Sequence, residues 1–486
     1  MSTDNHKITG KLILTAKIKN TSPLLIATGK GEETDLEVIK DSNGIPFIPA
    51  AGFAGMLAAS FKGPDLTFSD EQKKNKEYFW GSENAESKNK NLSQSHVIID
   101  DLKIDGSCDI VTRDGVAISI MTGTAIEGAK YDYELIEPGA TFILNSEITL
   151  RQGFSKASFL EFIGYICKKG EEGEYQQGAF KSSGFGMLKW ENIALYDYDF
   201  TDKNSKAAEK WFEYLESGKH SESNEITLKE EERLRIHSGF KEDVLTIKGE
   251  FEIKNSLIIS TKDFNAAEKT PDKTHLKNKS GQPLITGKSL KGPIRHRALK
   301  ILNTIREQDV VKPINAKGEA EKSKNEIYFI DKLFGFVDEN NKKAKASRVK
   351  SFETEINGAN KEQVQTRIKI DRFTGGTIGS ALMQTQPLWH DDEKFTLRFQ
   401  VEKCSKAEAG LLLLVMKDLM TEDLPIGGEK AIGRGILKGK ELTVSGMVEG
   451  EKTIIKFNTT GIAEEHKNKI DVVNTWVKNI KTEKYE

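Results

Sequence analysis

The chain has 486 residues, which is long enough for two or three domains with substantial cores. Charged residues make up 30% of it, but Lys and Arg almost balance Asp and Glu and leave a net charge of −2. This balance excludes a globally basic nucleic-acid binder, so any RNA or DNA contact has to be local.

The three cysteines are scattered without a CxxC pair, which argues against a disulfide framework or a zinc site and indicates a reducing compartment. The N-terminus has no apolar signal core, and the longest apolar run, residues 411–416, is far too short to span a bilayer. We therefore expect a cytoplasmic protein that makes no membrane contact.

The first half opens with an alternating strand at residues 12–18, followed by the loop "GKGEETDLEVIKD" and the stretch "PFIPAAGFAGML" from Pro46. The latter is typical of a short strand, a turn and a helix. A strong strand follows at residues 141–150, then a helix at 155–168, a glycine loop at 184–186 and a last strand. Residues 198–240 are polar and charged, and we interpret them as a linker with short helices.

The second half repeats this order. A strand at 245–253 and a loop precede "GQPLITGKSLKGPIRHRALK" from Gly281, which predicts a buried strand, a glycine turn and a basic helix capped by Ser289. A strand at 394–401, a helix at 406–419 and a second glycine loop at 433–435 follow. The tail after residue 447 ends in an expected helix with one apolar face, which we expect to dock on its own domain. That face carries Ile470, Val473, Trp476 and Val477.

Six short matches link the halves in a fixed order, at separations of 235 to 254 residues. They predict an internal duplication, with an insertion in the second copy around residues 307–325. The order strand-helix-strand-strand-helix-strand in each copy predicts an α+β protein of two tandem ferredoxin-like domains, the fold of RNA-recognition motifs, with large insertions. The expected boundaries are 1–197 and 241–447 for the domains, 198–240 for the linker and 448–486 for the tail.

The sequence has no P-loop, GxSxG or HExxH motif, and its eight histidines are dispersed. Asp35 and Asp272 each lie eleven residues before the proline that opens a strand-turn-helix stretch, Pro46 or Pro283. This equal spacing makes them candidates for one role: binding a divalent cation, or removing the proton of a ribose 2′-OH. The alternative is that both aspartates are ordinary solvated residues of surface loops without a catalytic role. Four nearby acids compete with the two aspartates: Glu32, Glu33, Asp263 and Glu268.

Several basic and glycine positions are candidates for phosphate contact. A cluster of Lys288, Lys291, Arg295 and Arg297 surrounds one helix N-terminus, whose free N–H groups and dipole suit a phosphate chain. The glycine loops would let an RNA backbone approach closely. The alternatives are solvated lysines, surface ion pairs and plain tight turns. The remaining candidates are Lys181, Gly184, Gly186, Gly433, Arg434 and Gly435 in the loops, and Arg113, Arg348, Arg367 and Arg372 near the central segments.

The motifs "PLITGKSLKGPIRHRA", "LFGF", "ASRV", "RIKIDRFTGG" and "GGEKAIGRG", with weaker counterparts in the first half, resemble the RAMP superfamily. More narrowly, the chain is similar to the backbone subunits of type III CRISPR effector complexes, and its tandem arrangement resembles the fused subunits of type III-D-like systems. The resemblance covers both halves and misses the linker and the tail.

The resemblance implies a filament of such units along a guide RNA, with a hairpin thumb inserted into the guide–target duplex. It places the thumbs at Thr122–Gly123 and Thr374–Gly375, and the target-cutting loop aspartates, with a divalent ion such as Mg²⁺ or Mn²⁺, at Asp35 and Asp272. The first half has "AAGFAG" in place of the basic "GKSLKG", so its guide contacts would rest on backbone N–H groups around Gly52 and Gly55. The implied partners are guide RNA, target RNA, further backbone units, a large polymerase-like subunit and small subunits.

The sequence therefore leads to a first hypothesis, a guide-RNA-binding antiviral subunit with metal-dependent endoribonuclease activity on target RNA. A scaffold with inert aspartates is the first alternative. A guide-RNA processing endoribonuclease, which would use a histidine or lysine acid–base set and no metal, is the second.

Overall fold

The computed structural model describes residues 7–29, 31, 34–62, 66, 68–81, 94–119, 122–202, 204, 206–234, 243–261, 271–306, 327–338, 342–357, 363–379, 382–389 and 393–482. The chain forms two compact units. Unit 1 contains residues 1–111, 134–179 and 185–241, and unit 2 contains residues 112–133, 180–184 and 242–486. The insertion predicted at 307–325 lies outside the described residues.

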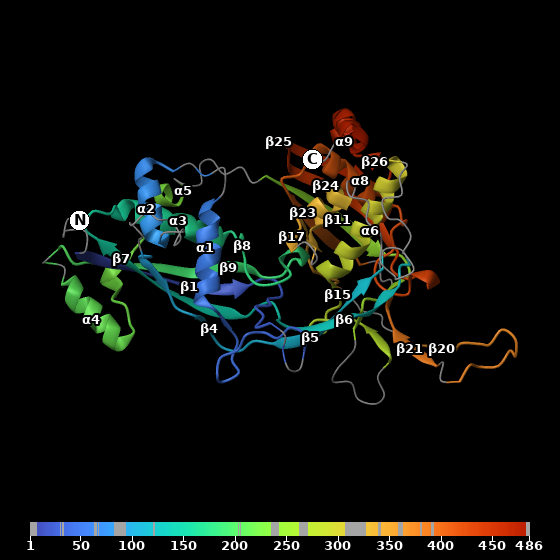
Figure 1. The fold of residues 1–486 in the computed structure, drawn as a ribbon, viewed down its shortest axis with the longest axis horizontal. Coiled ribbons are helices and arrows are strands. Elements are labelled where there is room, and N and C mark those ends of the chain that lie inside the picture. Colours follow the sequence, from blue (N-terminus) through green and yellow to red (C-terminus); the bar gives the residue numbers. More distant parts are fainter. Residues whose placement is uncertain are drawn as a thin grey trace. The chain divides into compact units, whose positions relative to one another are not determined.

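The sheet of unit 1 is built around β1 (Ile8–Asn20), which pairs antiparallel with β7 (Thr141–Arg151) and β9 (Met187–Asp199) (Figure 1). Beyond β7 lie β3 (Val97–Ile99) and β4 (Leu102–Ile104), and β4 pairs with β2 (Phe47–Ile48). The short β8 (Tyr175–Gln176) pairs with β9. If the core strands are numbered along the chain, their order across the sheet is 4-1-3-2: β9, β1, β7 and then β3 with β4. This is the strand order of a ferredoxin-like fold.

The helices of unit 1 are α1 (Ala50–Ala59), α2 (Asp70–Trp80) and α3 (Lys156–Glu171), with the 3₁₀ helix η2 (Ser60–Lys62) after α1. Phe142, Leu144 and Ile148 of β7 are buried, as the alternating pattern predicts. The core beneath the helices is aromatic, because Phe61 and Phe79 each meet Phe162 edge to face. α3 begins after Ser155, whose hydroxyl accepts a hydrogen bond from the Ser158 N–H.

The segment predicted as a linker, 198–240, packs on unit 1 over most of its described length. It contains α4 (Ala207–Ser217), η4 (Glu222–Asn224), β10 (Glu225–Ile226), which pairs with β9, and α5 (Glu230–Leu234). Trp211 of α4 packs against Ile13 and Tyr198. Ile13 points to the sheet face opposite to Leu12 and Leu14, so α4 covers that second face.

Unit 2 contains a second sheet, in the order β18 (Val349–Ser351), β23 (Phe395–Glu402), β11 (Val244–Ile253), β24 (Leu437–Val448), β25 (Glu451–Asn458) and β26 (Gly461–Ile462). Its helices are α6 (Gly287–Arg306), α7 (Ile327–Phe334), α8 (Lys406–Met420) and α9 (Ile470–Thr482), with η6 (Glu464–Lys469) before α9. The first four strands have the same ferredoxin-like order as in unit 1. The predicted α+β class with two tandem ferredoxin-like units is therefore confirmed.

The C-terminal tail is more than a helix, because β25 and β26 extend the sheet of unit 2. α9 docks on α8 of the same unit, as predicted, and buries Trp476 and Ile480. A Cβ atom at Gly410 of α8 would lie 2.4 Å from the carbonyl oxygen of Trp476, so the helices touch closely there. Of the four residues on the predicted apolar face, Trp476 is buried, Val473 and Val477 pack against the core, and Ile470 is 53% exposed.

Smaller strand pairs complete unit 2. They are β12 (Ser256–Leu257) with β22 (Leu388–Trp389), β15 (Leu284–Ile285) with β19 (Thr354–Glu355), β16 (Phe336–Asp338) with β17 (Lys343–Lys345), and the four-stranded sheet of β13 (Ser260–Thr261), β14 (Lys273–His275), β21 (Met383–Gln386) and β20 (Gln365–Arg367). Hairpins lie at both predicted thumbs. Residues 112–133 of the hairpin β5 (Ile110–Ile118) and β6 (Ala125–Ile136) belong to unit 2, and the β20–β21 hairpin projects from that unit (Figure 1).

The duplication is visible in individual hydrogen bonds. The turn that precedes α1 has an Asp41 N–H bond to the Ile45 carbonyl, and the turn before α6 has the same bond from Asn278 to Gln282. These two positions are 237 residues from their counterparts, which is also the separation between Asp35 and Asp272.

The expected cap of the basic helix was wrong. α6 begins at Gly287, and the Thr286 hydroxyl, not that of Ser289, accepts a bond at the helix start, from the Ser289 N–H at 3.2 Å.

Candidate nucleic-acid interface

A cavity of about 590 Å³ lies within unit 2, between the β5–β6 hairpin and the first turns of α6. Residues at or next to two short strands, β13 and β14, and at the start of the second glycine loop also line it. The lining residues are Arg113, Asp114, Gly115, Val116, Ala117, Ile118, Ala125, Tyr131 and Tyr133 from the hairpin, Lys288, Ser289, Gly292, Pro293 and His296 from α6, and Ile259, Ser260, Lys273, Leu276, Thr286, Gly427, Gly428 and Lys430 from the rest.

The cavity is electropositive. Among the described residues that line it, the one carboxylate is Asp114, which is ion-paired with Lys130 at 3.0 Å. Burial lowers the pKa of Lys430, and burial together with the charges of Arg295 and Lys430 lowers the pKa of His296. Both shifts mean that the cationic forms lack compensation, and an anion in the cavity would relieve this cost.

Lys288 points into an aromatic cluster. Its Nζ atom lies 3.2 Å from the ring centre of Phe180, 3.6 Å from that of Tyr133 and 5.0 Å from that of Tyr131. The Nζ–Oη distance to Tyr131 is 3.3 Å. Burial and the nearby charge of Arg113 lower the pKa of Lys288 to about 6. The lysine predicted to contact phosphate is therefore half-buried against aromatic rings.

The other basic residues of α6 divide into two kinds. Arg295 pairs with Asp331 of α7 at 2.8 Å, and Arg297 pairs with Asp418 of α8 at 2.5 Å. Lys291 has a pKa lowered to about 8 by burial and by the charge of Arg295. The predicted basic cluster thus exists in sequence, but two of its members hold neighbouring helices together.

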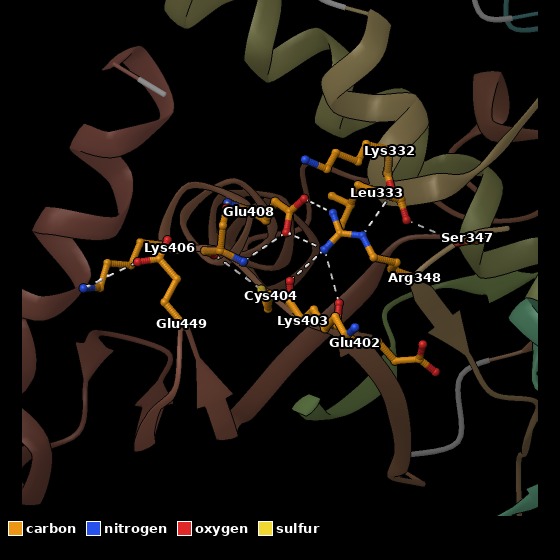
Figure 2. A network of polar contacts seen from close by, with 11 residues as sticks. Lys332, Leu333, Ser347, Arg348, Glu402, Lys403, Cys404, Lys406, Glu408 and Glu449 are labelled. Atoms are coloured by element: carbon orange, nitrogen blue, oxygen red, sulfur yellow. Dashed lines mark hydrogen bonds and ion pairs between the residues drawn. The ribbon is translucent and has the colours of Figure 1, made fainter. Parts of the chain in front are cut away.

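Three of the four arginines predicted near the central segments take part in internal ion pairs. Figure 2 shows Arg348 at the centre of a network, where its guanidinium binds the Glu408 carboxylate and donates to the carbonyl oxygens of Lys332 at 3.2 Å and Lys403 at 2.8 Å. Arg113 pairs with Glu353 at 2.6 Å, and Arg367 pairs with Glu429. The fourth, Arg372, is exposed at the tip of the β20–β21 hairpin.

The glycine loops have matching backbones, each a single 3₁₀ turn: η3 (Lys181–Ser183) and η5 (Lys430–Ile432). The turns end at Gly184 and Gly433, with φ of 83° and 82°. A Cβ at Gly184 would lie 2.9 Å from the Ser351 carbonyl oxygen, whereas the space around Gly433 is open. An RNA backbone therefore has room at the second loop, while the first loop packs on protein.

The remaining loop positions serve the turns themselves. A Cβ at Gly186 or Gly435 would lie 1.8 Å from a carbonyl oxygen of the same loop, so both glycines are required by the turn. Lys181 is exposed, and its pKa is lowered by partial desolvation and by the charge of Lys350. Arg434 is buried and pairs with Glu429 at 2.9 Å. In α1 of unit 1, Gly52 lies close to Gln177, and Gly55 faces open space.

Both predicted catalytic aspartates are exposed. Asp272 accepts a hydrogen bond from the Gln384 N–H at 2.8 Å, and its neighbour Lys273 lines the cavity. Asp35 lies in the equivalent loop of unit 1, while the four competing acids lie outside the described residues. No group of three or more His, Cys, Asp or Glu side chains suited to a metal is found among the described residues. Mg²⁺ commonly takes one or two carboxylates together with substrate phosphates, so each aspartate fits such an ion only when RNA supplies further ligands.

Comparison with known families decides the identity. A family model for the RAMP superfamily matches residues 17–189 and 227–438. The chain belongs to the RAMP superfamily. The two matches fall on the two halves of the duplication, so the chain is a tandem of two RAMP regions, as the motifs suggested. No curated protein matches the sequence.

Membership makes this a CRISPR-associated protein of an RNA-binding superfamily, some of whose members are ribonucleases. RAMP proteins of this kind work in complexes with RNA and other subunits. In the part of the chain that the structure describes, no helix is both long and apolar enough to cross a membrane.

Several residues of this RAMP cavity escaped sequence reasoning. Tyr131 and Tyr133 alternate in "YDY", and this period of two was a usable sign that both rings face the same side of a strand. Phe180, which contacts Lys288, and His296, which lines the cavity, carried no such signal, because their positions depend on tertiary structure.

Proposed function

We propose that this RAMP protein is a guide-RNA-binding backbone subunit of a type III CRISPR antiviral complex. The observation that carries the proposal is the electropositive cavity of unit 2, whose lining bears lysines and a histidine and one ion-paired carboxylate among the described residues. A ribose-phosphate strand placed there would neutralise Lys273 and Lys430 and meet the N-terminal turn of α6. The open space at Gly433 would admit its backbone.

We further propose that Asp272 and Asp35 support cleavage of the target RNA. In this reaction a ribose 2′-hydroxyl gives its proton to the carboxylate or to a water molecule, and its oxygen attacks the adjacent phosphorus. The bond to the 5′-oxygen breaks, the 5′-oxygen takes up a proton from water, and a 2′,3′-cyclic phosphate remains. Gln384 N–H holds one carboxylate oxygen of Asp272, which leaves the carboxylate in a fixed orientation toward solvent. A divalent ion bound by this carboxylate and RNA phosphates would supply charge stabilisation at the phosphorus.

The test uses the assembled complex with Asp35→Ala, Asp272→Ala and the double variant. We expect each single variant to lose its own subset of cleavage products and the double variant to lose all of them, while guide binding persists. Unchanged cleavage in the double variant would remove the catalytic assignment and leave a guide-RNA scaffold.

A guide-RNA processing endoribonuclease is the second candidate function, and one observation favours it. His296 and Lys430 both line the cavity, and a metal-free RNA cleavage needs such an acid–base pair. Cleavage of guide precursor that persists in EDTA and is lost in His296→Ala would support this function. Cleavage that EDTA abolishes would support the metal-dependent reaction.

A further inference from the structure

Lys288 is held by three aromatic rings, and two of them belong to the β5–β6 hairpin. Tyr131 and Tyr133 come from β6, and Phe180 immediately precedes η3. The rings contact one another as well, since Tyr133 lies 5.9 Å from Tyr131 and 5.2 Å from Phe180 between ring centres. The β5 strand accommodates this arrangement at Gly115, where a Cβ would lie 2.2 Å from the Tyr131 ring.

A second anchor binds the same hairpin. Arg113 of β5 is buried, and its guanidinium forms two hydrogen bonds with Glu353, at 2.6 and 3.3 Å. Such a bidentate pair fixes both position and orientation. We refer to these contacts together as the hairpin lock, which consists of Lys288, Phe180, Tyr131, Tyr133, Arg113 and Glu353.

Four of the six lock residues also line the cavity. Lys288, Arg113 and both tyrosines line it, so the distance between the hairpin and α6 depends on their contacts. A lysine whose Nζ lies within 3.6 Å of two ring centres has little room for a phosphate oxygen beside it. The π faces attract the protonated amine, and the alkyl stem packs against the rings in either protonation state.

The duplication shows that the lock is particular to this one pairing of hairpin and helix. At the separations that relate the two halves, Ala51 corresponds to Lys288 and Glu429 corresponds to Phe180. The β20–β21 hairpin has Gln365, Met383 and Thr385 at the positions of Arg113, Tyr131 and Tyr133. Phe180 and Glu429 share the same left-handed backbone, with φ of 53° and 56°, which supports the correspondence.

We propose that Lys288 is a positioning residue of the hairpin lock: it fixes residues 112–133 against α6 and thereby sets the width of the RNA cavity, without contacting phosphate. The part that concerns RNA rests on the proposed function. The part that concerns the hairpin stands on the contacts alone.

The test compares Lys288→Ala with Tyr133→Leu and Tyr133→Phe in the full-length chain, by amide hydrogen exchange over residues 112–133. We expect Lys288→Ala and Tyr133→Leu each to speed exchange of the hairpin about tenfold or more, with little further effect in the double variant. Tyr133→Phe keeps the ring and should leave exchange unchanged. Unchanged exchange in both Lys288→Ala and Tyr133→Leu would overturn the proposal. If Lys288→Ala does not fold, the comparison of Tyr133→Leu with Tyr133→Phe is the test, and equal exchange in these two variants would overturn the proposal.

The second readout is the salt dependence of binding to a fluorescein-labelled single-stranded RNA. Loss of one phosphate contact lowers the slope of log K against log salt by about 0.7. We expect this reduction in Lys430→Met and an unchanged slope in Lys288→Ala. A reduced slope with normal hairpin exchange in Lys288→Ala would make Lys288 a phosphate contact instead. If the wild-type chain does not bind RNA, the proposed function fails. The hydrogen-exchange experiment still tests whether Lys288 fixes the hairpin, because it does not depend on RNA.

Discussion

At the scale of single residues, the basic side chains of unit 2 differ in what surrounds them. Arg295, Arg297 and Arg348 each face a carboxylate of a neighbouring helix, and the network around Arg348 leaves little of its guanidinium for solvent (Figure 2). Lys291 and Lys430 instead have lowered pKa values because burial is incompletely compensated. We infer that the ion-paired arginines stabilise the fold, whereas the two lysines with lowered pKa values are available to bind an anion.

Replacing Arg348 tests the first kind. Arg348→Ala leaves Glu408 buried without its cation, and we expect it to lower the free energy of unfolding by about 3–5 kcal/mol. Urea denaturation measures this loss, and the salt slope of RNA binding should stay at the wild-type value. A stable variant with a reduced slope would show that Arg348 contacts phosphate after all.

Lys291 tests the second kind through pH. Its pKa in the folded chain is about 8, below the ordinary value of 10.5, so between these pH values the unfolded chain binds more protons. Stability therefore rises with pH across this window, and below it the full cost of burying the charge is present. We expect the melting temperature of wild type, relative to Lys291→Met, to increase from pH 8 to pH 10. A constant difference would show that Lys291 is not desolvated.

At the scale of elements, two helix glycines with different surroundings make a matched pair. Gly410 of α8 faces the backbone of α9, whereas Gly55 of α1 faces open space. Gly410→Ala should destabilise the chain by about 1–3 kcal/mol through overpacking, and Gly55→Ala should stabilise it by about 0.5–1 kcal/mol. Thermal unfolding measures both. Weaker RNA binding by the more stable Gly55→Ala chain would support the predicted backbone contact at Gly55, and equal binding would argue against it.

Sequence reasoning succeeded for the elements whose signal is local. The strand at residues 141–150 was predicted from its period of two, and β7 (Thr141–Arg151) buries the expected face. It failed where a partner far along the chain decides the outcome. β10 has two residues and exists because β9 pairs with it, and β25 forms because β24 offers an open edge.

The candidate site divides in the same way. Its glycine turns and the equal placement of Asp35 and Asp272 follow from spacing that a repeat preserves. The ion pairs that occupy Arg113, Arg348 and Arg367 could not be foreseen, because each acid lies dozens to hundreds of residues away in sequence. A basic residue near a phosphate-binding motif thus says little until its carboxylate neighbours are known.

At the scale of the whole molecule, the two hairpins both belong to unit 2 but differ in what their tips expose. Each has exposed apolar side chains, such as Val116 in the first and Ile370 in the second, but the β20–β21 hairpin also has Phe373 fully exposed at its tip. The tip itself is ordered by Asp371, whose carboxylate accepts from the Phe373 N–H at 2.7 Å. An exposed apolar hairpin of this kind is typical of a surface that a partner covers.

The partner is not expected to be a second copy of this chain. The β20–β21 hairpin has Gln365, Met383 and Thr385 in place of the lock residues, and α1 offers Ala51 where α6 has Lys288. Copies stacked end to end would therefore lack both anchors that hold the first hairpin. We expect sedimentation velocity to show only species that contain one copy of the chain over a hundredfold range of protein concentration. The same result is expected with a guide RNA that is too short to bind two chains at once. A concentration-dependent ladder that disappears when residues 368–378 are replaced by a glycine turn would show that copies do stack, and that apolar contact at the tip suffices without a lock.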